Sequence, residues 1–151
     1  MSRRHEGITL IEVVVAIAIV GILATIAFPS YQQYRLRVNR SIGKQCLLDV
    51  QRKQEGFYMR NNTYTSDLPA LGFATTGGGF ACQADSAPLY TVTIAAGANT
   101  CCYSVSAAPV TSQSTDGTLM LSYYSPNSPG NARPVPLVVK TRMVGNVDKG
   151  W

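Results

Sequence analysis

The sequence is poor in the residue types that most catalytic and metal sites use. Histidine occurs once, at His5, and the acidic residues number eight in 151. After residue 5 no imidazole remains to act as a general base or a zinc ligand. The later carboxylates are scattered without a recognisable acid/base pairing: Glu12, Asp49, Glu55, Asp67, Asp85, Asp116 and Asp148. No nucleophile elbow, phosphate loop or metal-ligand spacing is present, so we expect no enzymatic activity, no cofactor and no metal.

Charge is also nearly absent from the first apolar segment. Residues 8–28 contain Glu12 as their only charged side chain. A helix of this length measures about 31 Å, enough to cross a bilayer core of about 30 Å. Two arginines precede the segment, as is typical of the cytoplasmic flank of a membrane anchor. A cleaved secretory signal fits less well, because the apolar stretch is too long and is followed by Pro29 and Tyr31 where small residues are required.

A simple membrane anchor does not explain Glu12. A carboxylate in hydrocarbon is costly, so it neutralises, reaches water or finds a cation. As the fifth residue from Ile8, Glu12 lies near enough to the expected membrane surface to extend toward water. Alternatively, the α-amine of a neighbouring chain pairs with it inside the apolar layer, which would set the register of a helix bundle. The residues alone leave both interpretations open.

The segment GITLIE, which starts at Gly7, resembles the processing site of the type IV pilins. The resemblance implies that a membrane peptidase cleaves after Gly7 and that the new amine of Ile8 is methylated, although the family usually has Phe at this position. It also implies that Glu12 pairs with the N-terminal amine of a neighbouring subunit and that Pro29 bends the helix. The apolar helix would then serve first as a membrane anchor and later as the core of a fibre.

Residues 29–60 mix charged and apolar side chains at helical spacing. Pro29 should bend the helix without ending it, because the helical pattern resumes at once. Gly43 and Gly56 are weak points that each cost up to about 1 kcal/mol relative to Ala. We therefore expect one long helix, apolar on all sides at first and amphipathic later, with one stripe packed on a globular head. The stripe contains Val38, Ile42, Cys46, Val50 and Phe57.

Residues 61–151 predict a small β-sheet head. Strands are expected at 89–95, 102–108 and 118–124, with a fourth or edge strand at 137–139. The first two alternate, with one set of side chains directed toward an apolar partner and mostly Ser and Thr on the other face. The inward set is Tyr90, Val92, Ile94, Tyr103, Val105 and Ala107. Three consecutive glycines at 77–79 predict a flexible loop, and four prolines leave the path of the tail after residue 124 open.

Residues 51–73 strengthen the family resemblance. Their sequence, QRKQEGFYMRNNTYTSDLPALGF, is similar to the helix end and loop of a minor-pilin subgroup that includes the competence pilin, a DNA receptor. We interpret Tyr64 and Leu68 in this loop as structural plugs. The resemblance implies the type IV pilin fold, an α+β architecture with a long bent N-terminal helix packed on a small antiparallel sheet and stapled by disulfides. The expected parts are a leader (1–7), a membrane and fibre-core helix (8–28), the amphipathic half of that helix (29–60) and the head with its tail (61–151).

Four cysteines predict disulfides in a head exported to an oxidising compartment. Three pairings exist, and adjacent Cys101 and Cys102 are poorly placed to join each other. Cys101 shares the strand face of the inward side chains, so we expect it to meet Cys46, with Cys82 joined to Cys102 on the outer side. The alternative, in which Cys46 joins Cys102 and Cys82 joins Cys101, stays open.

The charge balance offers a limited indication of an anionic partner. The net charge of +5 becomes +4 when residues 1–7 are removed. In the tail, four cations face only Asp148: Arg133, Lys140, Arg142 and Lys149. Such a surface collects phosphates with strong salt dependence. A solvated face explains the same cations more simply, and DNA contact is the alternative.

The resemblance implies a structural subunit of a type IV pilus, processed by prepilin peptidase and assembled with other pilins by inner-membrane machinery. Before assembly it would span the inner membrane once, with the head in the periplasm, and afterwards it would lie in a pilus at the cell surface. A minor pilin that binds DNA for uptake is the first alternative. A pseudopilin of a type II secretion system is the second, although the tail lacks the acidic calcium loop found in the major pseudopilins.

Overall fold

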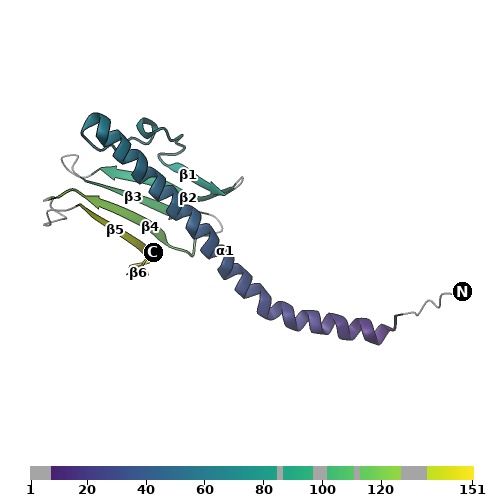
Figure 1. Ribbon diagram of the computed structural model, residues 1–151. Coiled ribbons are helices and arrows are strands. Elements are labelled where there is room, and N and C mark those ends of the chain that lie inside the picture. Colours follow the sequence, from purple (N-terminus) through teal and green to yellow (C-terminus); the bar gives the residue numbers. More distant parts are fainter. Residues whose placement is uncertain (1–7, 85–86, 97–101, 111–112, 127–135) are drawn as a thin grey trace, which may run out of the picture. The chain divides into compact units, whose positions relative to one another are not determined.

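The computed structural model describes residues 8–84, 87–96, 102–110, 113–126 and 136–151. The chain forms two compact units, Met1–Arg37 and Val38–Trp151. Helix α1 (Leu10–Asn61) belongs to both units, and the strands belong to the second (Figure 1). The expected leader, with Gly7, lies outside the described residues.

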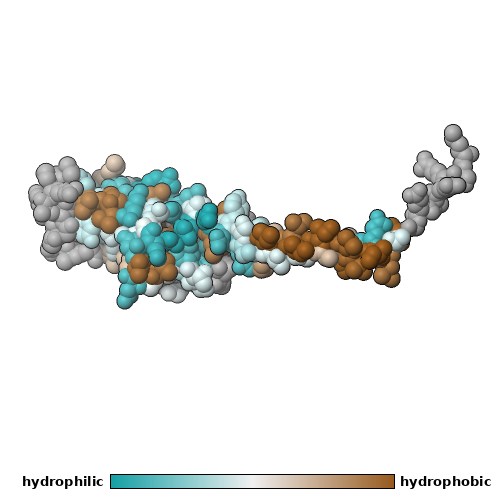
Figure 2. All heavy atoms as spheres, turned by 90° about the horizontal axis from the view of Figure 1, so that it is seen from below, coloured by the Kyte–Doolittle hydropathy of each residue, from teal (hydrophilic) through white to brown (hydrophobic). Residues whose placement is uncertain are grey.

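In the first unit, the helix from Leu10 to Phe28 has apolar side chains on every side. Helix α1 continues through Pro29, as the sequence predicted. Its large apolar side chains are exposed, including Leu10 near the start (83% exposed) and Phe28 (66% exposed). Figure 2 shows these side chains gathered along the N-terminal half of α1. By length and composition this helix contains a segment that could cross a membrane, and none of that segment is buried within the chain.

The second unit contains a six-stranded antiparallel sheet in which each strand pairs with its neighbours along the chain. The three main strands expected from the sequence are confirmed as β2 (Ala87–Ala96), β3 (Cys102–Pro109) and β4 (Thr118–Tyr124). Strand β5 (Leu137–Val144) is longer than the expected edge strand. Strands β1 (Phe80–Ala84) and β6 (Val147–Asp148) were not expected from the sequence, because they are short and carry little alternation.

The core lies between α1 and the sheet, and Figure 1 shows α1 crossing one face of the strands. The inward side chains of β2 and β3 are confirmed, with Tyr90, Val92 and Val105 fully buried. The helix stripe is partly wrong, because Val38 is 41% exposed. Val50 of the stripe is buried, and Ile42, Cys46 and Phe57 are partly buried against the core. Three residues of α1 outside the stripe are also buried: Gly43, Leu47 and Gln54.

Among the described glycines of α1, Gly43 is the one that packs directly against the sheet. A Cβ added there would lie 2.8 Å from the Tyr90 ring and 2.9 Å from Cδ1 of Leu119. The glycine that seemed only a weak point in a helix is therefore required by packing, because no side chain fits between helix and ring.

The segment between α1 and β1 closes one edge of the core. Tyr64 and Leu68 are buried, as expected, and the 3-10 turn η1 (Pro69–Leu71) buries Leu71. The three glycines expected to form a flexible loop instead form a tight hairpin. Gly77 and Gly78 have φ of 63° and 83°. The backbone N–H groups of Thr76 and Gly79 each donate a hydrogen bond to the other residue's carbonyl. Two consecutive positive φ values suit a two-residue hairpin turn, which glycine forms without strain.

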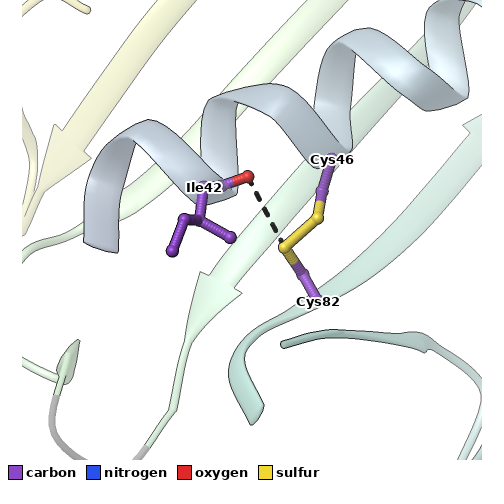
Figure 3. The surroundings of a disulfide bond; sticks show 3 residues. All are labelled: Ile42, Cys46 and Cys82. Atoms are coloured by element: carbon purple, nitrogen blue, oxygen red, sulfur yellow. Dashed lines mark hydrogen bonds between the residues drawn. A yellow bond between two sulfur atoms is a disulfide. The ribbon is translucent and has the colours of Figure 1, made fainter. Parts of the chain in front are cut away.

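The predicted disulfide pairing is wrong. Cys46 on α1 is bonded to Cys82 on β1, with their Cα atoms 6.2 Å apart (Figure 3). Cys102 is a free, half-buried thiol. Sγ of Cys82 also lies 3.6 Å from the carbonyl oxygen of Ile42. Because β1 was not recognised, Cys82 was placed on the outer side, whereas it pairs in register with Tyr90 and shares its buried face. Cys101 lies outside the described residues.

Candidate functional site

The expected processing site begins at the first described residues. Ile8 is 77% exposed, and the helix starts two residues later. Oγ1 of Thr9 accepts a hydrogen bond of 3.4 Å from the backbone N–H of Glu12, and the Thr9 carbonyl accepts one from Val13. Thr9 and Glu12 therefore occupy the N-cap and N3 positions, in the T-x-x-E spacing of a capping box. Sequence reasoning missed this cap, although the spacing is readable.

Glu12 therefore has a role at the helix start besides any intermolecular one. Its carboxylate lies in the first turn, where the helix dipole favours negative charge. The side chain is exposed, and the ion pairs found among the described residues do not include it. The carboxylate is thus available to a cation from outside this chain.

The head contains a buried cluster of polar groups around Asp116, which we call the Asp116 cluster: Arg40, Tyr90, Gln113, Asp116 and Arg142. The side chain of Asp116 is only 1% exposed. It accepts hydrogen bonds from Nε of Arg40 at 2.9 and 3.0 Å and from the Tyr90 hydroxyl at 2.6 Å. The cluster joins α1, β2, β5 and the turn before β4 around one carboxylate.

The electrostatics of Asp116 follow from these contacts. Burial acts to raise its pKa, but hydrogen bonds from Arg40 and Tyr90, with the charges of Arg40 and Arg142, outweigh burial and lower the pKa from its ordinary value. The pKa of Tyr90 is raised, first by burial and then by its bond to Asp116. Asp116 is thus held ionised and Tyr90 neutral, so the cluster is a structural device in which two arginines compensate one buried carboxylate.

The four tail cations proposed for DNA contact are placed differently by the structure. Arg142 is turned inward: its Nη1 donates to the Asp116 carbonyl at 3.1 Å, and its side chain is 17% exposed. Arg142 is therefore engaged in the fold and is not a free surface cation. Lys140 and Lys149 are exposed. Arg133 lies outside the described residues.

Lys140 lies beside the only tryptophan of the chain. Its Nζ is 5.0 Å from the centre of the Trp151 ring, and Nζ of Lys44, on α1, is 5.5 Å from the same ring. The indole N–H of Trp151 donates to the Thr141 carbonyl at 2.8 Å, which fixes the ring against β5. Lys44 did not stand out in the sequence, because it is separated from the tail by most of the head.

Comparison with known proteins supplies the family. Residues 2–28 match the prokaryotic N-terminal methylation motif. The type IV major pilin protein PilA of Myxococcus xanthus is 34% identical over 73 residues, which are 48% of this chain and 33% of that protein. The type IV wide pilus major component PilA4 of Thermus thermophilus is 39% identical over 69 residues, covering 46% and 53% of the two chains. The type IV major pilin protein PilE of Neisseria gonorrhoeae is 35% identical over 78 residues, covering 50% and 46%.

The chain thus spans between a third and about half the length of these curated relatives. No solved structure matches it. Residues 29–120, more than half of the chain, match a family described as the type IV minor pilin ComP, DNA uptake sequence receptor. By this match, which runs from Pro29 of α1 into β4, the chain belongs to the ComP family of type IV minor pilins.

Proposed function

We propose that this chain is a minor subunit of a type IV pilus whose head binds DNA for uptake. The observation that carries the proposal is the family match over residues 29–120, joined to a methylation motif at residues 2–28. The first covers most of the head, and the second covers the segment by which the subunit would be processed and assembled.

Assembly rests on the apolar half of α1. The side chains from Ile8 to Phe28 are exposed and are not covered by the rest of the described chain. Lipid tails or the same helices of neighbouring subunits would cover them. Cleavage after Gly7 exposes the amine of Ile8, which is then methylated. The Glu12 carboxylate, unpaired among the described residues, binds that amine of a neighbouring subunit and sets its register.

The partners follow from this life cycle. Prepilin peptidase removes the leader, the inner-membrane assembly machinery transfers the subunit, and other pilins surround it in the filament. Before assembly the chain spans the inner membrane with its head in the periplasm. The subunit acts by assembly and binding, without catalysis. The relatives named above are described as pilins or a pilus component, which favours a pilus over a secretion pseudopilus.

Mass spectrometry of sheared filaments tests processing and assembly. The expected N-terminus is Ile8 carrying one additional methyl group. Glu12→Ala should leave membrane insertion unchanged and reduce incorporation into filaments, whereas Glu55→Gln, which alters the next glutamate along the chain, should leave incorporation unchanged. An intact Met1, or normal incorporation of the Glu12 variant, contradicts the assembly proposal.

Binding of the full chain, solubilised in micelles, to duplex DNA tests the receptor proposal. Fluorescence anisotropy of labelled DNA should show an affinity that falls steeply with salt, because phosphate contacts release counterions. Absence of binding even at low salt contradicts the DNA function and leaves the assembly proposal intact.

A further inference from the structure

We propose that Lys44, Lys140 and Trp151 form a contact site for the sugar–phosphate backbone of DNA. The inference rests on the DNA function proposed above and places it on one face of the head. Lys44 belongs to α1, Lys140 to β5, and Trp151 follows β6, so three separate elements bring these side chains together.

The two lysines, like Lys53, Arg60 and Lys149, have no acidic partner among the described residues, whereas three arginines of the second unit do. Arg40 and Arg142 neutralise Asp116, and Arg52 pairs with Asp49. Among the ion pairs of the described residues, neither Lys44 nor Lys140 occurs. The adjacent acid of the tail, Asp148, is already engaged, because its Oδ1 accepts backbone N–H bonds from Gly150 at 2.7 Å and from Arg142 at 3.3 Å.

Two ammonium groups near one ring carry an unfavourable mutual repulsion. Their separation is at most the sum of the two distances to the ring centre, 5.0 and 5.5 Å, which is on the order of the Debye length of about 8–10 Å at ordinary ionic strength. One lysine beside the ring already forms a cation–π contact, which contributes about 0.5–1 kcal/mol at an exposed site. That contact does not explain why a second lysine lies beside the same ring. An anion bound beside both ammonium groups would remove the repulsion.

Backbone phosphates are the anions that suit this spacing. A DNA strand presents one negative charge for about every 3.4 Å of its axis, so neighbouring phosphates of one strand can reach both lysines. Trp151 acts as a positioning residue: its ring, held by the bond to Thr141, keeps the two flexible lysine stems at one place. The lysines are point charges that bind phosphate without reading bases, so this contact provides affinity and orientation rather than sequence preference.

The test measures DNA binding of the full chain in micelles across a salt series. The double variant Lys44→Gln/Lys140→Gln should lose two phosphate contacts, which makes the negative slope of log K against log salt shallower by about 1.8 and weakens binding on the order of 100-fold at 50 mM salt. Lys53→Gln is the matched control, because Lys53 also lies on α1 with its Nζ 4.0 Å from an aromatic ring, that of Phe73. It should leave the slope unchanged.

Trp151 provides a second, local readout. As the only tryptophan, its fluorescence reports this site alone, and DNA should quench it in the parent chain and in Lys53→Gln but not in the double lysine variant. Trp151→Leu should weaken binding and Trp151→Phe should restore part of it, since Phe keeps an aromatic face for the ammonium groups but lacks the N–H that donates to Thr141.

The outcomes separate the two proposals. If the parent chain binds DNA and the double lysine variant binds with the same slope and affinity, the site is wrong while the DNA function stands. If the parent chain does not bind DNA at any salt, both are wrong. If Trp151 fluorescence responds to vesicles containing anionic lipid and not to DNA, the lysines face a membrane surface, and the DNA contact is likewise refuted.

Discussion

Arg40 and Asp116 bind each other across the junction between α1 and the turn that precedes β4, with Nε of Arg40 2.9 Å from one carboxylate oxygen and 3.0 Å from the other. The arginine side chain is 23% exposed and the aspartate 1%. A pair this well buried is costly to break, because the surviving partner keeps its desolvation without its counter-charge.

We predict that Asp116→Ala destabilises the head by about 3–5 kcal/mol, since it leaves Arg40 and Arg142 without their acid and the Tyr90 hydroxyl without its acceptor. Urea unfolding of the full chain in micelles measures the loss. Asp49→Ala is the control: it removes an exposed pair with Arg52, whose contribution is below about 1 kcal/mol. Equal losses in the two variants would show that the Asp116 cluster contributes no more than a surface ion pair.

Stability should also depend on pH through Asp116. The folded state lowers its pKa, so the stabilisation is fully present above the ordinary pKa of about 4 and is lost as pH falls through the lower folded pKa. The melting temperature of the parent chain should therefore decline below about pH 4 more steeply than that of Asp116→Asn. Parallel curves for the two chains would rule out Asp116 as the source of the acid sensitivity.

Two helix glycines should respond oppositely to the same substitution. Gly43→Ala should destabilise by about 1–3 kcal/mol, because its new methyl group would lie within 3 Å of Tyr90 and Leu119. Gly56→Ala should stabilise by up to about 1 kcal/mol, because no atom lies within 4 Å of the added carbon and alanine favours helix. Chemical denaturation of both variants measures the difference, and a stabilising Gly43→Ala would contradict the packing described.

Peptide mapping without reduction should recover Cys46 joined to Cys82, with Cys102 alkylated as a free thiol. Removing the bridge by Cys46→Ser/Cys82→Ser should cost about 3–4 kcal/mol, because it closes a loop of 36 residues in the unfolded chain. Cys102→Ser serves as the control with little expected change. A peptide joining Cys46 to Cys101 would restore the pairing first expected from the sequence.

Much of the architecture could be read from the sequence because it rests on local periodicity. The helix through Pro29 and the alternation of β2 and β3 follow from patterns within a few turns or residues. The N-terminal motif was readable for a similar reason, since Gly7, Ile8 and Glu12 lie within six residues.

What could not be read depends on which distant segments meet. Pairing Cys46 with Cys82 requires the register of β1, a strand of five residues with weak alternation. Arg142 looked like a surface cation because nothing nearby in sequence indicates that β5 places it against Asp116. Lys44 is near the tail because its Nζ lies 5.5 Å from the centre of the Trp151 ring, a contact between residues more than 100 positions apart.

The strand order has a consequence for how the head acquires its structure as the chain is made. Every strand of the meander pairs with one that precedes or follows it directly, so hairpins can form one after another as the polypeptide emerges. The links that bring remote segments to the helix, Cys46 to Cys82 and Arg40 to Asp116, can close only once β1 and the turn before β4 have arrived, which gives the maturation of this subunit a direction in time.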